Sequence, residues 1–323
     1  MLGATGHIGA HVVRALLAEG HEVRAAYRTP RFLTVLEGLS VERVRVDLDT
    51  LDGVREALDG REWVFHAGGF YPGFRNRRED AIEHGIVSTR RLLGQVRQAR
   101  PSRVVFTSSA ATIRKVPGRY ADERDAEAWP LSGWRPLYST VKIAMEQEVL
   151  RAFQEGLPVV IVNPSLCIGE FDAHPFSGRA VLVYAKHHLP VYVDHAFNAV
   201  YTGDVGVGHL RAAERGRLGE RYLLTGRTVT LKEFAAQVAA LSSVTPPRWR
   251  LPYASVLMAA ALAECLGWLT RTEPLLTRQV VHSLRAEQLL DGTKAVTELS
   301  VPQTPLEEAI RRALAWFTDN NYL

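Results

Sequence analysis

Hydrophobic and polar positions follow two different periods along the first half of the chain. Short apolar runs rich in β-branched residues are typical of buried strands. Between these runs, apolar residues recur at the three- and four-residue spacing of helices that bury one face. The predicted strands are 21–28, 42–47, 62–67, 102–109 and 157–165, and the predicted helices are 10–20, 50–60, 81–100 and 138–156.

This alternation of strand and helix predicts an α/β fold. It implies right-handed βαβ units that build a parallel sheet covered by helices on both faces. Three of the predicted helices end in glycine, the residue that most often stops a helix. We therefore expect a doubly wound, Rossmann-type sheet.

The pattern changes after residue 165. The next segment mixes Pro, Gly, His and aromatic residues without a clear period, and a strand followed by a helix is then predicted over 199–216. The rest of the chain is mostly helical in pattern and ends in an amphipathic stretch, 304–323. The predicted domains are a Rossmann domain, residues 1–165 with 199–226, and a smaller, mostly helical substrate-binding lobe, residues 166–198 with 227–323.

Composition and charge narrow the range of partners. The net charge is only +4 and no basic run is interleaved with aromatic residues, so no nucleic-acid partner is expected. Two cysteines, Cys167 and Cys265, in unrelated contexts suggest a reducing compartment. The apolar stretch 251–268 is about as long as a bilayer span, yet it contains Pro252 and Glu264. We expect a buried or lid-like helix there, no membrane partner and a cytoplasmic protein.

The chain opens with the glycine pattern G-x-x-G-x-x-G, formed by Gly3, Gly6 and Gly9. The first glycine allows a tight turn, the second lets the backbone approach a phosphate, and the third lets the following helix pack closely on the sheet. The helix would aim its free N–H groups and positive dipole end at a pyrophosphate. This pattern predicts a dinucleotide site.

Such a loop normally follows a buried strand, and there is no room for one before residue 3. A doubly wound sheet needs that strand at its centre, covered on both faces. The sequence alone leads us to expect a natural start upstream of Met1. The alternative is a folded sheet that lacks this strand.

The end of strand 21–28 bears on the choice of cofactor. Folds that prefer NAD usually place an acid there for the ribose hydroxyls, whereas this chain has Tyr27, Arg28 and Arg31. Arg28 is suited to pair bidentately with a 2′-phosphate, so NADP is favoured over NAD. Asp47 and Leu48, which end the next strand, are predicted to bond the adenine amino group.

Tyr138 and Lys142 are four residues apart and would share one face of a helix. A tyrosine has an ordinary pKa of about 10, and a nearby ammonium group would stabilise the phenolate and lower that pKa. Tyr138 could then deliver a proton to a carbonyl oxygen while a hydride reaches the carbon, and Lys142 could hold the nicotinamide ribose. The run "FTSS" adds serine hydroxyls at the sheet edge where ligands bind.

Together these motifs resemble the extended short-chain dehydrogenase/reductases of the NAD-dependent epimerase/dehydratase family. Within this family, the chain's motifs are most similar to those of the dihydroflavonol-4-reductase-like and hopanoid-associated sugar epimerase-like proteins. The resemblance runs nearly end to end, through "GATGHIG", "VDLD", "VFHAGG", "VVFTSSAAT", "YSTVK" and "VNPSLCIGE". It implies a catalytic triad of Ser109, Tyr138 and Lys142, with Ser108 as an alternate, and a homodimer through the long helices 75–100 and 138–155. The further cofactor contacts that it implies are Thr5, His7, Ile8, His66, Ala67, Gly68, Thr107, Ser108, Pro164, Ser165 and Leu166.

Within this family the sequence favours a carbonyl reductase or alcohol dehydrogenase that acts on a small carbonyl or hydroxy compound. Nucleotide-sugar epimerases typically carry an arginine for the substrate diphosphate shortly before the "GD" segment, and Phe197 stands at that position. A nucleotide-sugar epimerase and a non-enzymatic NADP-binding sensor remain as alternatives. The chain also departs from the family at Gly85, where an asparagine is usual.

The segments around the predicted cleft supply candidate pocket residues, although a packing role is an alternative for each of them. The histidines of segment 172–198 match no standard set of metal ligands, so no metal is predicted. The predicted substrate-pocket residues are Phe70, Tyr71, Phe74, Ala110, His174, Tyr192 and Phe197.

Overall fold

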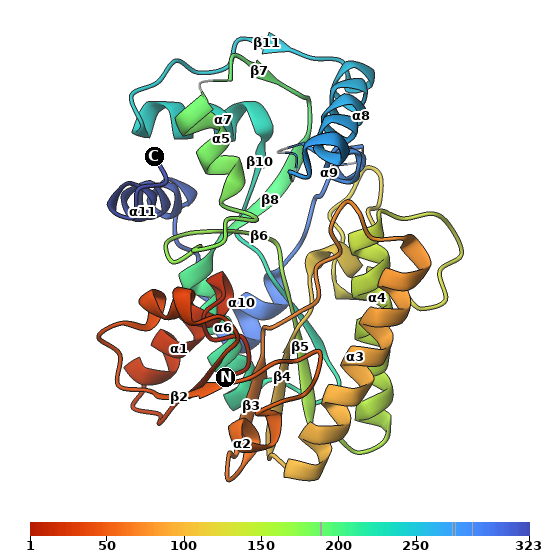
Figure 1. Cartoon of the computed structure of the whole chain (residues 1–323), viewed down its shortest axis with the longest axis vertical. Helices are drawn as coiled ribbons and strands as arrows, with labels where there is room; N and C mark the ends of the chain where they lie inside the picture. The colour runs from red at the N-terminus through yellow and green to blue at the C-terminus, as the bar shows by residue number, and fades with distance from the viewer. Residues whose placement is uncertain (188, 273, 275, 286) are drawn as a thin grey trace.

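The computed structural model describes residues 1–187, 189–272, 274, 276–285 and 287–323. Figure 1 shows the first half of the chain as alternating strands and helices. Its elements are α1 (His7–Ala18), β1 (Arg24–Tyr27), the 3-10 helix η1 (Pro30–Leu36), β2 (Glu42–Arg45), α2 (Val54–Leu58), β3 (Trp63–His66), α3 (Arg78–Ala99), β4 (Arg103–Thr107), the 3-10 helices η2 (Ala110–Thr112) and η3 (Glu123–Asp125), α4 (Leu137–Gln154) and β5 (Val159–Pro164).

The second half adds short strands and more helices. They are β6 (Leu166–Ile168), α5 (Arg179–His187), β7 (Val191–Tyr192), β8 (Ala196–Tyr201), α6 (Thr202–Arg215), β9 (Arg221–Leu224), β10 (Arg227–Thr230), α7 (Leu231–Leu241), β11 (Trp249–Arg250), α8 (Tyr253–Thr270), α9 (Arg278–Ser283), α10 (Thr293–Leu299) and α11 (Leu306–Asp319).

The main sheet is parallel. Strands β3, β4, β5 and β9 are neighbours in that order, and β1 pairs with β2. Leu2 joins the two parts, because it forms parallel bridges to Ala26 of β1 and to His66 of β3. The resulting order β2-β1-Leu2-β3-β4-β5-β9 confirms the predicted doubly wound α/β fold. Leu2 therefore occupies the central position for which the sequence offers no strand.

Backbone hydrogen bonds fix the start of the chain in this position. On one side, Ala26 N–H donates to Met1 O at 2.9 Å and Ala4 N–H donates to Ala26 O at 3.0 Å. On the other side, Leu2 N–H donates to Phe65 O at 2.8 Å. The Met1 ammonium group is buried and donates to Arg24 O at 2.8 Å, and this burial lowers its pKa to about 5.

Two helical layers cover the sheet. Apolar residues of α1 and α6 pack on one face, and those of α3 and α4 pack on the other. Gly85 lies where α3 meets α4, and a Cβ there would come within 2.9 Å of Val141 Cγ1. The glycine that departs from the family pattern therefore allows these two helices to approach closely.

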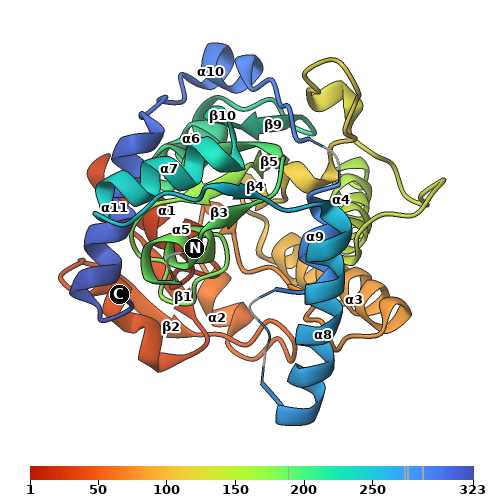
Figure 2. The same ribbon diagram turned by 90° about the horizontal axis from the view of Figure 1, so that it is seen from above.

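A second group of elements lies above the carboxyl ends of the main strands (Figure 1). Strands β10, β8 and β6 form a small sheet that packs with α5, α7 and α11, and β7 pairs with β11. Helix α8 runs along the outer edge of the molecule (Figure 2). The helix expected over 251–268 is thus present. Only 22% of it is buried, which contradicts the buried alternative, while the lid-like alternative stays a prediction. The division into two domains stays a prediction.

Candidate active site

The glycine loop forms the turn that a pyrophosphate site requires. Gly3 has φ +81°, and a Cβ on it would lie 2.6 Å from Gly68 N. A Cβ on Gly9 would lie 2.0 Å from Gly3 O, so only glycine fits there. Gly6 is the N-cap of α1, and among the described residues no side chain hydrogen-bonds this helix start as a cap. The loop and the first turn of α1 therefore fit a dinucleotide pyrophosphate.

The other predicted loop residues have different neighbours. His7 hydrogen-bonds the Thr202 hydroxyl at 2.9 Å and lies 3.8 Å from Asp172, while burial lowers its pKa. Ile8 packs on the core, and Thr5 lies in the turn before α1. His7 thus fastens the glycine loop to the β8–α6 segment.

The carboxyl ends of β1 and β2 form the edge where the sequence predicts the adenosine site. The Arg28 side chain is 70% exposed, and its Nη1 lies 3.7 Å from Asp49 Oδ2. Asp47 Oδ1 accepts from Asp49 N–H at 2.8 Å and so shapes the following turn. Leu48 Cδ1 lies 2.7 Å from where a Gly68 Cβ would be, which places Leu48 beside the glycine loop. Arg31 is turned toward the Phe32 ring, 4.6 Å away.

The ends of β3, β4 and β5 contain the remaining predicted cofactor contacts. His66 is buried, its pKa is lowered to about 3 mainly by burial, and its Nδ1 has no hydrogen-bond partner within the described residues. Ala67 N–H donates to Leu2 O at 3.0 Å, and the Thr107 hydroxyl hydrogen-bonds His209 Nε2 at 2.8 Å. Pro164 ends β5, and Ser165 and Leu166 follow it directly.

Helix α4 presents Tyr138 and Lys142 on one face, as the spacing predicts. Burial raises the pKa of the Tyr138 phenol, and the nearby hydroxyl groups of Ser109 and Tyr71 oppose this shift only in part. The expectation that Lys142 lowers the pKa of Tyr138 is therefore wrong for this structure. The ammonium nitrogen lies 5.9 Å from the centre of the Tyr138 ring, and desolvation outweighs the hydroxyl donors.

Lys142 is almost completely buried, with 2% of its surface exposed. Burial lowers its pKa to about 8, and the negative charge of Glu146 opposes this shift. Its Nζ lies 5.0 Å from the centre of the Tyr71 ring and 2.7 Å from where a Gly69 Cβ would be. Gly69 thus leaves the space that the lysine end occupies.

Glu146, one turn beyond Lys142, is the centre of a buried polar network that sequence reasoning missed. One carboxylate oxygen accepts from the Ser108 hydroxyl, from the Thr112 hydroxyl at 3.1 Å and from Asn163 Nδ2 at 2.9 Å. The other accepts from Arg221 Nε at 2.5 Å. Ser108 is therefore engaged with Glu146 below the site, whereas Ser109 faces Tyr138. The four-residue spacing of Tyr138, Lys142 and Glu146 was the signal available in the sequence.

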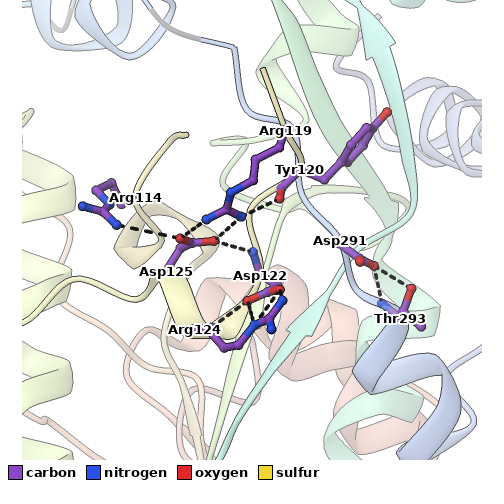
Figure 3. A network of polar contacts seen from close by, with 8 residues as sticks. All are labelled: Arg114, Arg119, Tyr120, Asp122, Arg124, Asp125, Asp291 and Thr293. Atoms are coloured by element: carbon purple, nitrogen blue, oxygen red, sulfur yellow. Dashed lines mark hydrogen bonds and ion pairs between the residues drawn. The ribbon is translucent and has the colours of Figure 1, made fainter. Parts of the chain in front are cut away.

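The segment after Ser109 is held by a second polar network, which Figure 3 shows from close by. The Arg119 guanidinium donates to both oxygens of Asp125, at 2.8 and 2.5 Å, and Asp122 N–H donates to the same carboxylate at 3.1 Å. Ala121 N–H donates to Leu289 O at 3.0 Å, which ties this loop to the segment before α10. These bonds fix the chain that leaves the serine pair.

Aromatic rings form a wall beside Tyr138. The Tyr71 ring stacks on the Tyr138 ring with centroids 5.5 Å apart and an interplanar angle of 18°. Phe176, which the sequence did not single out, lies 5.2 Å from the Tyr71 ring and 6.2 Å from the Tyr138 ring. Phe70 is directed instead to His84, at 4.4 Å, and Phe74 lies near Gly267 of α8.

Three predicted pocket residues are found elsewhere, and these predictions are corrected. Phe197 is 6% exposed and packs in the core against Phe234 of α7, because its strand β8 turns this side chain toward that helix. Tyr192 lies in β7 beside Lys232, whose Nζ is 5.5 Å from its ring. His174 packs edge-on against Phe32 and, with Arg31, lines a separate cavity of about 510 Å³.

The remaining predictions concern Ala110 and the histidines of segment 172–198. Ala110 begins η2 and is buried in a small apolar cluster. His188 lies outside the described residues. Among the residues that the structure does describe, no group of His, Cys, Asp and Glu side chains could hold a metal ion.

Comparison with known proteins agrees with this geometry. The model of the NAD-dependent epimerase/dehydratase family matches residues 1–224. The "Putative dihydroflavonol 4-reductase" of Synechocystis sp. is 32% identical over 99% of this chain and 94% of its own length. "Sterol demethylase protein B" of Methylococcus capsulatus is also 32% identical, over 99% of this chain and 98% of its own length.

A solved structure of a nucleoside-diphosphate-sugar epimerase from Pseudomonas aeruginosa has a similar fold. It matches with a TM-score of 0.79 and 29% identity, over 100% of this chain and 97% of that one. The glycine loop at the centre of the parallel sheet and the extent of these matches lead to one conclusion. The chain belongs to the NAD-dependent epimerase/dehydratase family.

Proposed function

We propose that this protein is an NADP-dependent carbonyl reductase, which in reverse acts as an alcohol dehydrogenase. Its substrate is a small or medium hydroxy-carbonyl compound with a flat apolar portion. The observation that carries the proposal is the packing of Ser109, Tyr138 and Lys142 beneath the rings of Tyr71 and Phe176. Such a wall suits a planar apolar group held next to a proton donor.

The chemistry assigned to each side chain follows from its surroundings. Because burial raises its pKa, the Tyr138 phenol keeps its proton at neutral pH and delivers it to the substrate oxygen. The Ser109 hydroxyl, on the same side, orients that oxygen by a hydrogen bond. The Lys142 ammonium, 5.9 Å from the centre of the Tyr138 ring, would hold the ribose of the nicotinamide beside that phenol. When bound, the nicotinamide supplies the hydride to the carbonyl carbon.

The position of Phe197 supports a reductase rather than a nucleotide-sugar epimerase. This residue stands where such epimerases hold the substrate diphosphate with an arginine, and it packs in an apolar core with Phe234. The similarity to the Pseudomonas epimerase keeps epimerisation as the second candidate function.

NADPH absorbance distinguishes the two candidates. We expect net oxidation of NADPH when the protein is mixed with a panel of aromatic and aliphatic ketones and aldehydes. Interconversion of a nucleotide sugar with no net change in absorbance would replace the reductase by the epimerase. Tight NADPH binding with neither reaction would make the protein a cofactor-binding sensor.

Arg28 tests the preference for NADP. The Arg28→Ala variant should lose about 10- to 100-fold in kcat/KM for NADPH while the value for NADH changes little, since a charge-assisted pair to the 2′-phosphate contributes about 1.5–3 kcal/mol. The matched control is Arg55→Ala, which removes an exposed arginine of α2. A wild-type preference for NADH would overturn the assignment of NADP.

A further inference from the structure

Helix α8 exposes a continuous apolar face. Met258, Leu262, Leu266 and Leu269 follow one another at helical spacing and, with Trp268, are each between 60% and 81% exposed. We call these five residues the α8 apolar face. Soluble proteins rarely expose a run of large apolar side chains along a whole helix unless the surface binds something.

The opposite side of α8 is anchored to the protein. Val256, Ala260, Glu264 and Gly267 are buried there. The Glu264 carboxylate accepts from Arg278 N–H at 2.7 Å and from Arg278 Nε at 2.6 Å. Glu264 is the only charged residue within α8, so the exposed side of the helix carries no charge. A helix packed on one side in this way is suited to lie on a surface rather than to cross a bilayer.

Basic residues precede and follow α8 along the chain, and one contacts its carboxyl-terminal end. Arg248 and the 66% exposed Trp249 precede the helix, and Arg271 follows it. Arg75 reaches the carboxyl-terminal end, where its Nη2 donates to Gly267 O at 2.9 Å and its guanidinium lies 5.5 Å from the Trp268 ring. An uncharged apolar helix face with arginines at both of its ends complements an interface that offers acyl chains and anionic headgroups.

We propose that the α8 apolar face docks this protein on the surface of an anionic phospholipid bilayer. Leucine and methionine side chains enter the boundary between headgroups and acyl chains, the tryptophans lie at headgroup level, and the arginines pair with lipid phosphates. This differs from the sequence-based expectation of no membrane partner, because the sequence alone does not reveal which face of the helix is covered.

The helix that carries the α8 apolar face contacts a loop of the proposed catalytic site. Through Arg75 and Phe74, the carboxyl-terminal end of α8 contacts the loop that carries Tyr71, and the Tyr71 ring stacks on Tyr138. When this protein is bound to the bilayer through α8, the loop would therefore lie near the bilayer surface. The inference does not depend on the proposed reaction, since its test measures binding to lipid and not turnover.

The test is co-sedimentation of the full-length protein with vesicles. We expect binding to vesicles of phosphatidylcholine mixed with phosphatidylglycerol, and binding at least about ten-fold weaker to phosphatidylcholine alone, because arginines near a charged surface attract anionic lipid. The variant L262E/L266E should lose about 100-fold or more in affinity for the anionic vesicles, since it replaces inserted side chains by repelled charges. The matched control L218E changes an exposed leucine outside α8 and should bind like the wild type.

Three results would overturn the proposal. They are wild-type protein that stays in the supernatant, binding that L262E/L266E leaves unchanged, and binding that L218E weakens equally. Light scattering after gel filtration checks the competing occupant, a second copy of the chain. A wild-type dimer that becomes a monomer in L262E/L266E, together with no vesicle binding, would assign the face to self-association. Thermal melts verify that both variants are folded, which the exposure of these leucines leads us to expect.

Discussion

Helices α4 and α8 each contain 18 residues, but they distribute polar and apolar groups in opposite ways. On α4, Lys142 and Glu146 are buried, and the Glu146 carboxylate has partners on four other segments. On α8, Leu262 and Leu266 are exposed and the single charged residue is buried. Buried polar groups are retained when partners within the chain compensate for desolvation. The exposed apolar side chains of α8 are not covered by other parts of the described chain, so we expect a binding partner to cover them.

The largest expected effect is on turnover, and it comes from a change at the catalytic face of α4. Tyr138→Phe should reduce turnover by about 10³-fold or more, because it removes the proton donor while leaving the ring in its stack. Cofactor affinity, measured by fluorescence titration with NADPH, should change little. The α8 variant L262E/L266E, assayed with a water-soluble substrate, should keep its turnover. Unchanged turnover in Tyr138→Phe would reject the triad.

A second test addresses the buried network under the serines. Glu146→Gln should lower the free energy of unfolding by about 3 kcal/mol, because it leaves the largely buried Arg221 guanidinium without its counter-charge. Urea unfolding measures this change. The control Glu148→Gln, on the same helix, should cost less than about 1 kcal/mol because its partners Arg90 and Arg151 are more than half exposed. Equal losses of unfolding free energy in the two variants would show that burial of the Glu146–Arg221 ion pair does not determine its contribution to stability.

A third test concerns the buried histidines, whose effect on stability appears only at acidic pH. Burial lowers the pKa of His209 to about 4, and it lowers the pKa values of His66 and His195 to about 3 and about 4. Below the ordinary histidine pKa of about 6.5 the unfolded chain binds protons that the folded chain does not, so stability is present above that pH and is lost as the pH falls toward 4.

Each such histidine contributes at most about 1.4 kcal/mol per pH unit in this window. His209→Gln should therefore flatten the loss of unfolding free energy between pH 6.5 and pH 4 by about that amount per unit, measured by urea titration at each pH. His174→Gln, at an exposed position, is the matched control. A slope that both variants leave unchanged would mean that His209 is not responsible for the acid sensitivity.

Local pattern predicted the Rossmann part of the fold well. Strand β4 lies within the predicted 102–109 and α4 begins one residue before Tyr138, because each of these elements buries a face that its own periodicity reveals. The catalytic face of α4 was predictable for the same reason, since a four-residue spacing is a local property.

What sequence reasoning missed depends on contacts between distant segments. Glu146 becomes a network centre only because Arg221, 75 residues away, reaches it. Phe197 looked like a pocket residue until its strand was seen to face Phe234. The apolar composition of α8 predicted a helix, but composition does not tell a covered helix from an exposed one.

The bridging role of Leu2 has a consequence for the dynamics of the sheet. In the part of the chain that the structure describes, strands β1 and β2 join the other strands through residues 1–4, with three backbone hydrogen bonds on the β1 side and two on the β3 side. Strand β2 lies at the edge of the sheet, pairs only with β1 among the described strands and exposes three of its four residues, which makes the β1–β2 edge a unit of local opening with a free energy below that of global unfolding. Amide hydrogens of β1 and β2 should then exchange with solvent earlier than those of β4 and β5. A dinucleotide that contacts both Gly3 and Arg28 would join the two parts of the sheet and slow that exchange.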